Sequence, residues 1–181
     1  MTEDSVVPVE KPTIGVIQMV SSQRVDTNLK RAEALIKEAA SEGVKAVFLP
    51  ENFAALGSTQ TRSIAEREAT DKGPVRQFLV EQAQRYGCWI FGGTLPVPVR
   101  LDGTHIASGR VRAASFAYDG AGRQIGRYDS RPMFAVDVDD NQQSYSESYQ
   151  VVLGHSTVVV DSPIGPCGLA IWYARDGGVL S

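Results

Sequence analysis

The stretches Ile14-Gly15-Val16-Ile17-Gln18-Met19 and Ala46-Val47-Phe48-Leu49 decide the fold class of this sequence. Each has the length and the apolar character of a buried strand. The segment between them predicts a helix, because its apolar residues share one helical face: Leu29, Ala32, Leu35, Ile36 and Ala39. Gly43 is expected just past the end of that helix, and the candidates for its N-cap are Asp26, Thr27 and Asn28. The order strand, helix, strand indicates an α/β fold.

A second helix and a third strand continue the pattern. Pro74 is expected at the first position of the helix, and Gly87 is expected to end it. Residues 88–94 are then expected to form the third strand. The resulting order β-α-β-α-β predicts helices packed on a sheet.

The second half of the chain predicts two hairpins separated by a loop. The paired strands are 111–118 with 124–128 around the turn Asp119-Gly120-Ala121-Gly122, and 157–160 with 168–172 around Ser162-Pro163-Ile164-Gly165. Between the hairpins, residues 137–154 are polar and irregular. A segment of this length and polarity is more often a functional loop than a spacer.

Composition and charge narrow the class of protein. The chain has 181 residues and a formal net charge of −3, which fits one globular domain and argues against a nucleic-acid partner. No apolar run approaches the roughly 18 residues that span a membrane, so no membrane partner is expected. Cys88 and Cys167 lie in separate apolar stretches and are interpreted as structural thiols, which makes the cytoplasm the expected location. His105 and His155 have no partners at metal-ligand spacing, so neither a metal nor a cofactor is predicted.

Glu51 is the first candidate for chemistry. It directly follows the second strand, and a carboxylate at the carboxyl end of a buried strand is well placed for acid–base catalysis. On position alone, a helix N-cap or a salt-bridged surface acid remains the favoured interpretation.

Four ordered segments then resemble motifs of the nitrilase superfamily, the carbon–nitrogen hydrolases. Leu49-Pro50-Glu51-Asn52-Phe53 resembles the segment with the catalytic Glu of that family, and residues 126–138 resemble the stretch around its catalytic Lys. Tyr145-Ser146-Glu147-Ser148 resembles its Tyr-Arg-Glu-Ser loop, and residues 163–171 resemble the strand that leads to its nucleophilic Cys. Four motifs in the right order are far more specific than any one of them.

The resemblance implies hydrolysis of a small amide or nitrile through a covalent intermediate. In that mechanism a Cys thiolate attacks the carbon, a carboxylate relays the proton and a Lys ammonium stabilises the developing charge. The resemblance assigns Glu51 and Glu147 to the catalytic carboxylates. It also implies substrate contacts for Asn52, Phe53 and Tyr173.

Two catalytic positions depart from the family pattern. Ser130 stands where the Lys belongs, and Trp172 stands where the Cys belongs. An indole has no free lone pair and cannot act as a nucleophile. Cys167 and Arg131 are the nearest substitutes, but strand alternation directs Cys167 to the opposite face and Pro132 constrains Arg131. The sequence therefore predicts a catalytically inactive relative of the ω-amidase-like branch.

The expected architecture is a nitrilase-like α-β-β-α sandwich that is incomplete at its C-terminus. Residues 1–12 are expected to form a flexible arm, and residues 13–181 the N-terminal part of a carbon–nitrogen hydrolase domain. Either a degenerate natural protein or a shortened, altered form of an active parent would have such a sequence. The apolar strand at 168–172 lacks a covering segment and predicts a homo-oligomer. The alternative function is that of a non-enzymatic binding or assembly partner.

Overall fold

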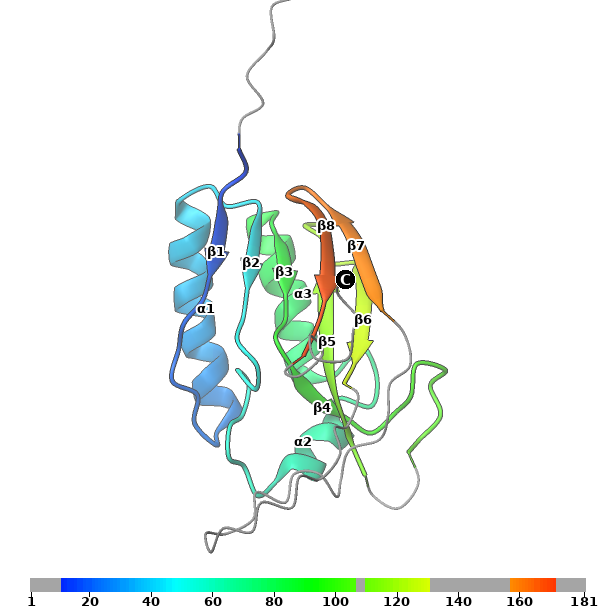
Figure 1. The fold of residues 1–181 in the computed structure, drawn as a ribbon. Helices are drawn as coiled ribbons and strands as arrows, with labels where there is room; N and C mark the ends of the chain where they lie inside the picture. Colours follow the sequence, from blue (N-terminus) through cyan, green and yellow to red (C-terminus); the bar gives the residue numbers. More distant parts are fainter. Residues whose placement is uncertain (1–10, 107–109, 131–156, 172–181) are drawn as a thin grey trace, which may run out of the picture.

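The main sheet forms the centre of the molecule. A computed structural model describes residues 11–106, 110–130 and 157–171, and in this part of the chain the sheet has six strands. The first three strands are parallel, and β5 pairs antiparallel with β3, β4 and β6 (Figure 1). The bounds are β1 Ile14–Val16, β2 Ala46–Phe48, β3 Trp89–Phe91, β4 Leu95–Val97, β5 Arg112–Tyr118 and β6 Gln124–Asp129.

Two helices cover one face of this sheet, and a short third helix lies at its end. They are α1 Val25–Ser41, α3 Pro74–Tyr86 and the short α2 Thr61–Arg67. Pro74 is the first residue of α3, and Gly43 and Gly87 follow α1 and α3 with φ of 72° and 61°, so these three predictions are confirmed. Only glycine takes such positive φ values without strain.

The predicted N-cap of α1 is wrong. The cap position is occupied by Arg24, and α1 begins at Val25. Asn28 lies inside the helix and is buried, where its side-chain amide donates to the carbonyl oxygens of Ser22 and Ala54, each at 2.8 Å. Asparagine often caps helices, but Asn28 instead connects the helix to Ala54, in the segment after Glu51.

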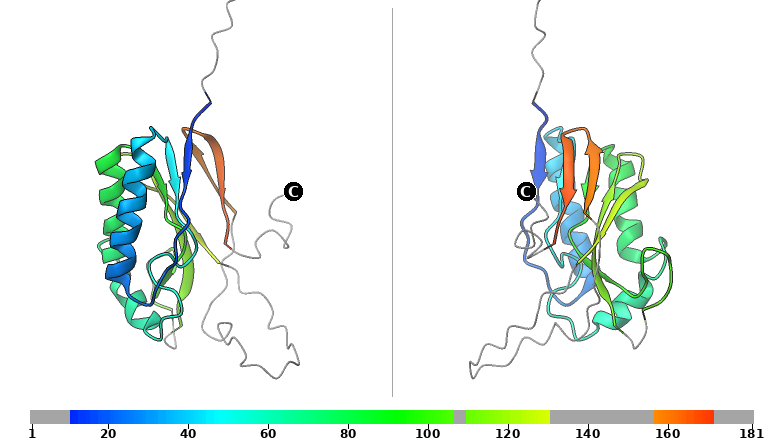
Figure 2. Two further views of the ribbon diagram at one scale, coloured as in Figure 1. Left: turned by 90° about the vertical axis from the view of Figure 1, so that its left-hand side faces the viewer. Right: turned by 45° about the vertical axis from the view of Figure 1, so that its right-hand side comes forward.

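A second, two-stranded sheet packs on the opposite face of the main sheet. Strands β7 (Val158–Ser162) and β8 (Gly165–Leu169) form the predicted hairpin, although β8 begins earlier than expected and the turn is correspondingly tighter. Figure 2 shows the resulting order of layers: helices, main sheet, second sheet. These are three of the layers of an α-β-β-α sandwich.

Two apolar clusters hold the layers together. The inner cluster lies between the helices and the main sheet, and its fully buried members include Ile36, Val47, Leu79, Ile90 and Phe116. The outer cluster lies between the two sheets and consists of Ala46, Phe91, Ala117, Tyr128, Val160, Leu169 and Ile171, with partly buried neighbours around it. Burial of these side chains provides the main stabilisation of the fold.

Candidate functional site at the end of strand β2

The position of Glu51 is fixed by the backbone on either side of it. Before it, the N–H of Leu49 donates to the carbonyl oxygen of Phe91 at 2.9 Å, so the pairing with β3 extends one residue beyond the end of β2. Beside it, Gly93 has a φ of 54°, and a Cβ atom there would lie 2.0 Å from the carbonyl oxygen of Pro50. Only glycine fits this contact, which holds the turn between β3 and β4 against Pro50.

The residues after Glu51 are held by Thr94. The N–H of Asn52 donates to Oγ1 of Thr94 at 2.9 Å, and that hydroxyl donates to Oδ1 of Asn52 at 3.4 Å. Asn52 has a φ of 51°, in the left-handed region that asparagine tolerates better than most residues. The next side chain, Phe53, is fully buried in the inner cluster. Glu51 itself is exposed, between two residues with fixed positions.

A small cavity adjoins Glu51 between the two sheets. Its volume is about 140 Å³. The polar side chains that line it are Glu51, Thr94 and Ser115, and the chain of β8 closes it from the second sheet at residues 168–170. Phe48 and Phe91, whose rings stack with centroids 4.3 Å apart, form its apolar wall. One carboxylate, two hydroxyls and an aromatic wall suit a small polar molecule with an amide-like group.

Ser130 lies on the same side of the main sheet as this cavity. Its N–H donates to the carbonyl oxygen of Ala113 at 2.9 Å and so extends the pairing of β5 and β6. Tyr128 belongs to the outer cluster, and a Cβ atom on Gly126 would contact Val160 of the second sheet. Strand alternation places Ser130 on that same face. It is not among the described residues that line the cavity.

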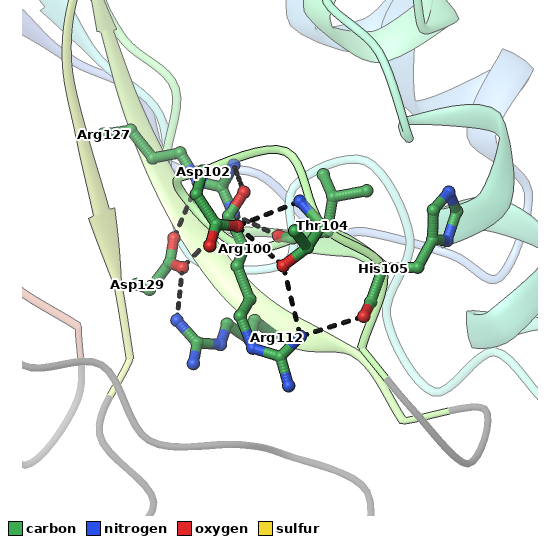
Figure 3. Close-up of polar contacts among 8 residues, drawn as sticks. Arg100, Asp102, Thr104, His105, Arg112, Arg127 and Asp129 are labelled. Atoms are coloured by element: carbon green, nitrogen blue, oxygen red, sulfur yellow. Dashed lines mark hydrogen bonds and ion pairs between the residues drawn. The ribbon is translucent and has the colours of Figure 1, made fainter.

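The end of β6 is anchored by ion pairs on the other face of the sheet. Asp129 accepts hydrogen bonds from Nη1 of Arg112 at 2.9 Å and from Nε of Arg127 at 2.7 Å, and Figure 3 shows the carboxylate between the two guanidinium groups. The exposed fraction of the side chain is 1% for Asp129 and 9% for each arginine. Arg127 also donates to the carbonyl oxygen of Val99 at 2.6 Å. This buried network fixes the strand end that leads into Ser130.

The remaining predicted site residues fall outside the described part of the chain. Glu147, Trp172 and Tyr173 belong to segments that the structure does not describe, so their roles stay predictions. Phe53 is described and lies fully buried in the inner cluster, and its predicted substrate contact also stays a prediction. Among the described residues, the structure places Glu51 in the cavity lining, bonds Asn52 to Thr94 of that lining and places Ser130 on the same face of the sheet.

The two thiols differ in their surroundings. Cys88 is buried in the inner cluster, and burial raises the pKa of its thiol, which keeps it protonated and unreactive. Cys167 is partly exposed on β8, with its Sγ 3.4 Å from Oγ of Ser162 near the hairpin turn. Cys167 is not among the described residues of the cavity lining.

The described segments contain neither a cluster of metal ligands nor a helix able to span a membrane. Within residues 11–106, 110–130 and 157–171, no three His, Cys, Asp or Glu side chains gather as metal ligands. Nor does any described helix combine the length and apolarity that crossing a bilayer requires. A larger cavity of about 500 Å³ lies between the start of α1 and the α2 region, away from every residue of the candidate site.

Comparison with known proteins identifies the family. The family model for carbon-nitrogen hydrolases matches residues 13–176, and the chain belongs to that family. Among its relatives, a deaminated glutathione amidase of Yersinia enterocolitica is 31% identical over 160 residues, which are 88% of this chain and 54% of the relative. Omega-amidase NIT2 of Danio rerio is 29% identical over 161 residues, with 88% and 54% covered.

Solved structures show the same fold. The NitFhit protein of C. elegans superimposes with a TM-score of 0.70 at 24% identity, covering 88% of this chain and 37% of that one. Nit3 of Saccharomyces cerevisiae, a member of the nitrilase superfamily, gives a TM-score of 0.67 at 23% identity, covering 86% and 53%. The predicted nitrilase-like α/β fold is therefore confirmed. The chain spans about half the length of the amidase relatives it matches.

Proposed function

We propose that this chain binds a small amide or nitrile in the cavity beside Glu51 and does not hydrolyse it. The observation that carries the proposal is the composition of the cavity. Among the described residues that line it, Glu51 is the one ionisable side chain. The family and its amidase relatives supply the class of ligand, and the residues at the other catalytic positions argue against turnover.

The chemical argument against turnover rests on two positions. Covalent hydrolysis needs a nucleophile with an available lone pair and a cation that stabilises the charge developing on oxygen or nitrogen. By resemblance, Trp172 stands in the nucleophile position and Ser130 in the cation position. An indole provides no lone pair, and a serine hydroxyl carries no charge. Loss of a covalent nucleophile alone lowers kcat by about 10⁶.

The binding function of Glu51 does not depend on these two residues. Its carboxylate can accept a hydrogen bond from the NH₂ group of a carboxamide, and such a bond to a charged acceptor is stronger than one between neutral groups. Phe48 and Phe91 offer an apolar wall for a short alkyl group. The cavity volume of about 140 Å³ limits the ligand to a small molecule or to the end of a larger one.

The experiment measures binding and turnover on the same protein with propionamide and propionitrile. Saturation-transfer NMR reports binding, and an ammonia assay reports turnover. We expect binding of propionamide without ammonia, weaker binding by Glu51→Gln, and unchanged binding by Glu81→Gln, an exposed glutamate on α3. Ammonia release that scales with protein concentration and disappears in Glu51→Ala would contradict the proposal, as would an absence of binding.

An assembly partner is the second candidate function, and the edge of the main sheet favours it. β1 pairs only with β2 in the described part of the chain, and its residues Ile14 and Val16 are 45% and 73% exposed. An apolar edge strand of this kind is a site for association. Light scattering should show a dimer or larger species that Val16→Lys shifts toward the monomer. A clean monomer at tens of micromolar would contradict homo-association.

Two further expectations belong to the same proposal. Cys88 and Cys167 are free thiols, which fits a protein of a reducing compartment such as the cytoplasm. A nucleic-acid partner is not proposed, since the formal net charge is −3.

A further inference from the structure

Ser115 occupies a gap in the pairing of the main sheet. β3 pairs with β5 at Tyr118 and Ala117, whereas β4 pairs with β5 at Ala114 and beyond. Ser115 lies between these two stretches, where the chain bends through Gly93 beside Pro50. Ser115 therefore lies beside the point at which the loop with Glu51 meets the sheet.

The side chain of Ser115 is directed toward the second sheet. Ala113 and Ala117, two residues away on either side, both pack in the outer cluster, and residues two apart on a strand share a face. Ser115 lines the cavity together with Glu51 and is 7% exposed. No hydrogen bond between its hydroxyl and another described residue is found, whereas the neighbouring Thr94 hydroxyl is hydrogen-bonded to Asn52.

Oγ of Ser115 is not among the buried polar atoms without a partner, which in the described residues are Oε1 of Gln82 and Nε of Arg112, so the hydroxyl remains accessible from the cavity. A ligand atom in the cavity can therefore accept its proton. The same cavity offers a carboxylate on Glu51, which accepts but does not donate. The two groups together are complementary to a molecule with one hydrogen-bond acceptor and one N–H donor.

We infer that Ser115 is a binding residue that selects the acceptor end of the ligand, an inference that rests on the proposed function. Its hydroxyl donates to the carbonyl oxygen of a primary carboxamide while Glu51 accepts from the NH₂ group. A nitrile offers only the acceptor and engages Ser115 alone. A carboxylate of the same shape lacks the N–H donor and is repelled by Glu51, so the pair discriminates carboxamides from carboxylates.

The experiment compares propionamide, propionitrile and propionate on wild type, Ser115→Ala and Glu51→Gln. Ser115→Ala should weaken the binding of propionamide and propionitrile by about two- to tenfold, the range for one neutral hydrogen bond. Glu51→Gln should weaken propionamide and leave propionitrile nearly unchanged. Propionate should bind wild type more weakly than propionamide does. A merely structural role of Ser115 would not produce this dependence on the ligand.

A control variant and two outcomes distinguish a failure of the Ser115 inference from a failure of the proposed function. Ser21→Ala removes another hydroxyl, which donates to the carbonyl oxygen of Phe53 outside the cavity lining, and should leave binding unchanged. Unaltered binding of both ligands by Ser115→Ala, with wild type binding them, overturns this inference and leaves the proposed function standing. Absence of propionamide binding by wild type overturns the proposed function and the inference with it.

Discussion

Replacement of Asp129 by alanine tests the buried network that anchors β6. The carboxylate is 1% exposed and accepts hydrogen bonds from two guanidinium groups, Arg112 at 2.9 Å and Arg127 at 2.7 Å. Asp129→Ala would leave two buried cations without their counterion. We expect the larger desolvation penalty at Arg112, because its buried Nε already has no hydrogen-bond partner among the described residues. Arg127 keeps its hydrogen bond to the carbonyl oxygen of Val99.

The expected loss of stability comes from the two arginines that stay buried without the carboxylate. Removing one partner of a buried ion pair lowers the free energy of unfolding by about 3–5 kcal/mol, out of a total of about 5–15 kcal/mol for a typical domain. Arg112→Met in the same chain removes one of the two uncompensated charges, so the double variant should regain part of the loss. The pair is buried, and added salt should change the result little.

Urea unfolding followed by far-ultraviolet circular dichroism measures this effect. The matched control is Glu66→Ala, which breaks the exposed pair of Arg62 and Glu66 and should change stability little. A loss for Asp129→Ala no larger than that of the control would refute the view that the network anchors β6. A double variant that loses more stability than the two single variants lose together would refute it as well.

Three further perturbations test the backbone and the buried charges. Gly93→Ala should lower the melting temperature far more than Gly103→Ala, since both have positive φ but only at Gly93 does the new Cβ meet backbone, 2.0 Å away. Thr94→Val removes the acceptor of the Asn52 N–H and should cost about 1–3 kcal/mol in urea unfolding; an unchanged midpoint would show that this bond is dispensable. Burial raises the pKa of the Glu68 carboxyl above its ordinary value of 4.5, although two backbone N–H groups oppose the rise. The folded chain then holds this proton more tightly than the unfolded chain, so the stability it contributes is present below about pH 4.5 and is lost as pH rises through the raised pKa. The stability of wild type relative to Glu68→Gln should therefore decline with rising pH in that window, and a flat difference would contradict the assignment.

Local signals in the sequence predict most of the described elements. The strands, α1, α3 and both hairpins follow from apolar periodicity and from Pro and Gly at element ends. The sequence predicts one strand over 88–94, but β3 ends at Phe91 and β4 starts at Leu95. That break depends on the contact of Gly93 with Pro50, which lies more than forty residues away along the chain. α2 has only seven residues, and the sequence does not predict it, because so short a helix depends on tertiary packing.

Some residues of the candidate site can likewise be predicted from the sequence, and others cannot. Glu51 is found from sequence because it follows a strand and lies in a recognisable motif. Ser115 is not, because a serine between Ala114 and Phe116 in a strand carries no local signal, and only the structure places it in the cavity lining. The network around Asp129 is likewise hidden, since strand register alone brings Arg112 to it.

The two parts of the candidate site have separate supports. Glu51 is held through Gly93 and Thr94 by the turn between β3 and β4, whereas the strand end with Ser130 is held by Asp129 and its arginines on the opposite face. These supports share none of the described residues. Each consists of packing, backbone geometry and ion pairs, which stabilise the fold whether or not a reaction takes place. A side chain at the position of Ser130 can therefore be exchanged without loosening Glu51. Under the proposed function, the same independence would let a chain of this family keep a cavity and its carboxylate while the residues needed for the covalent step change.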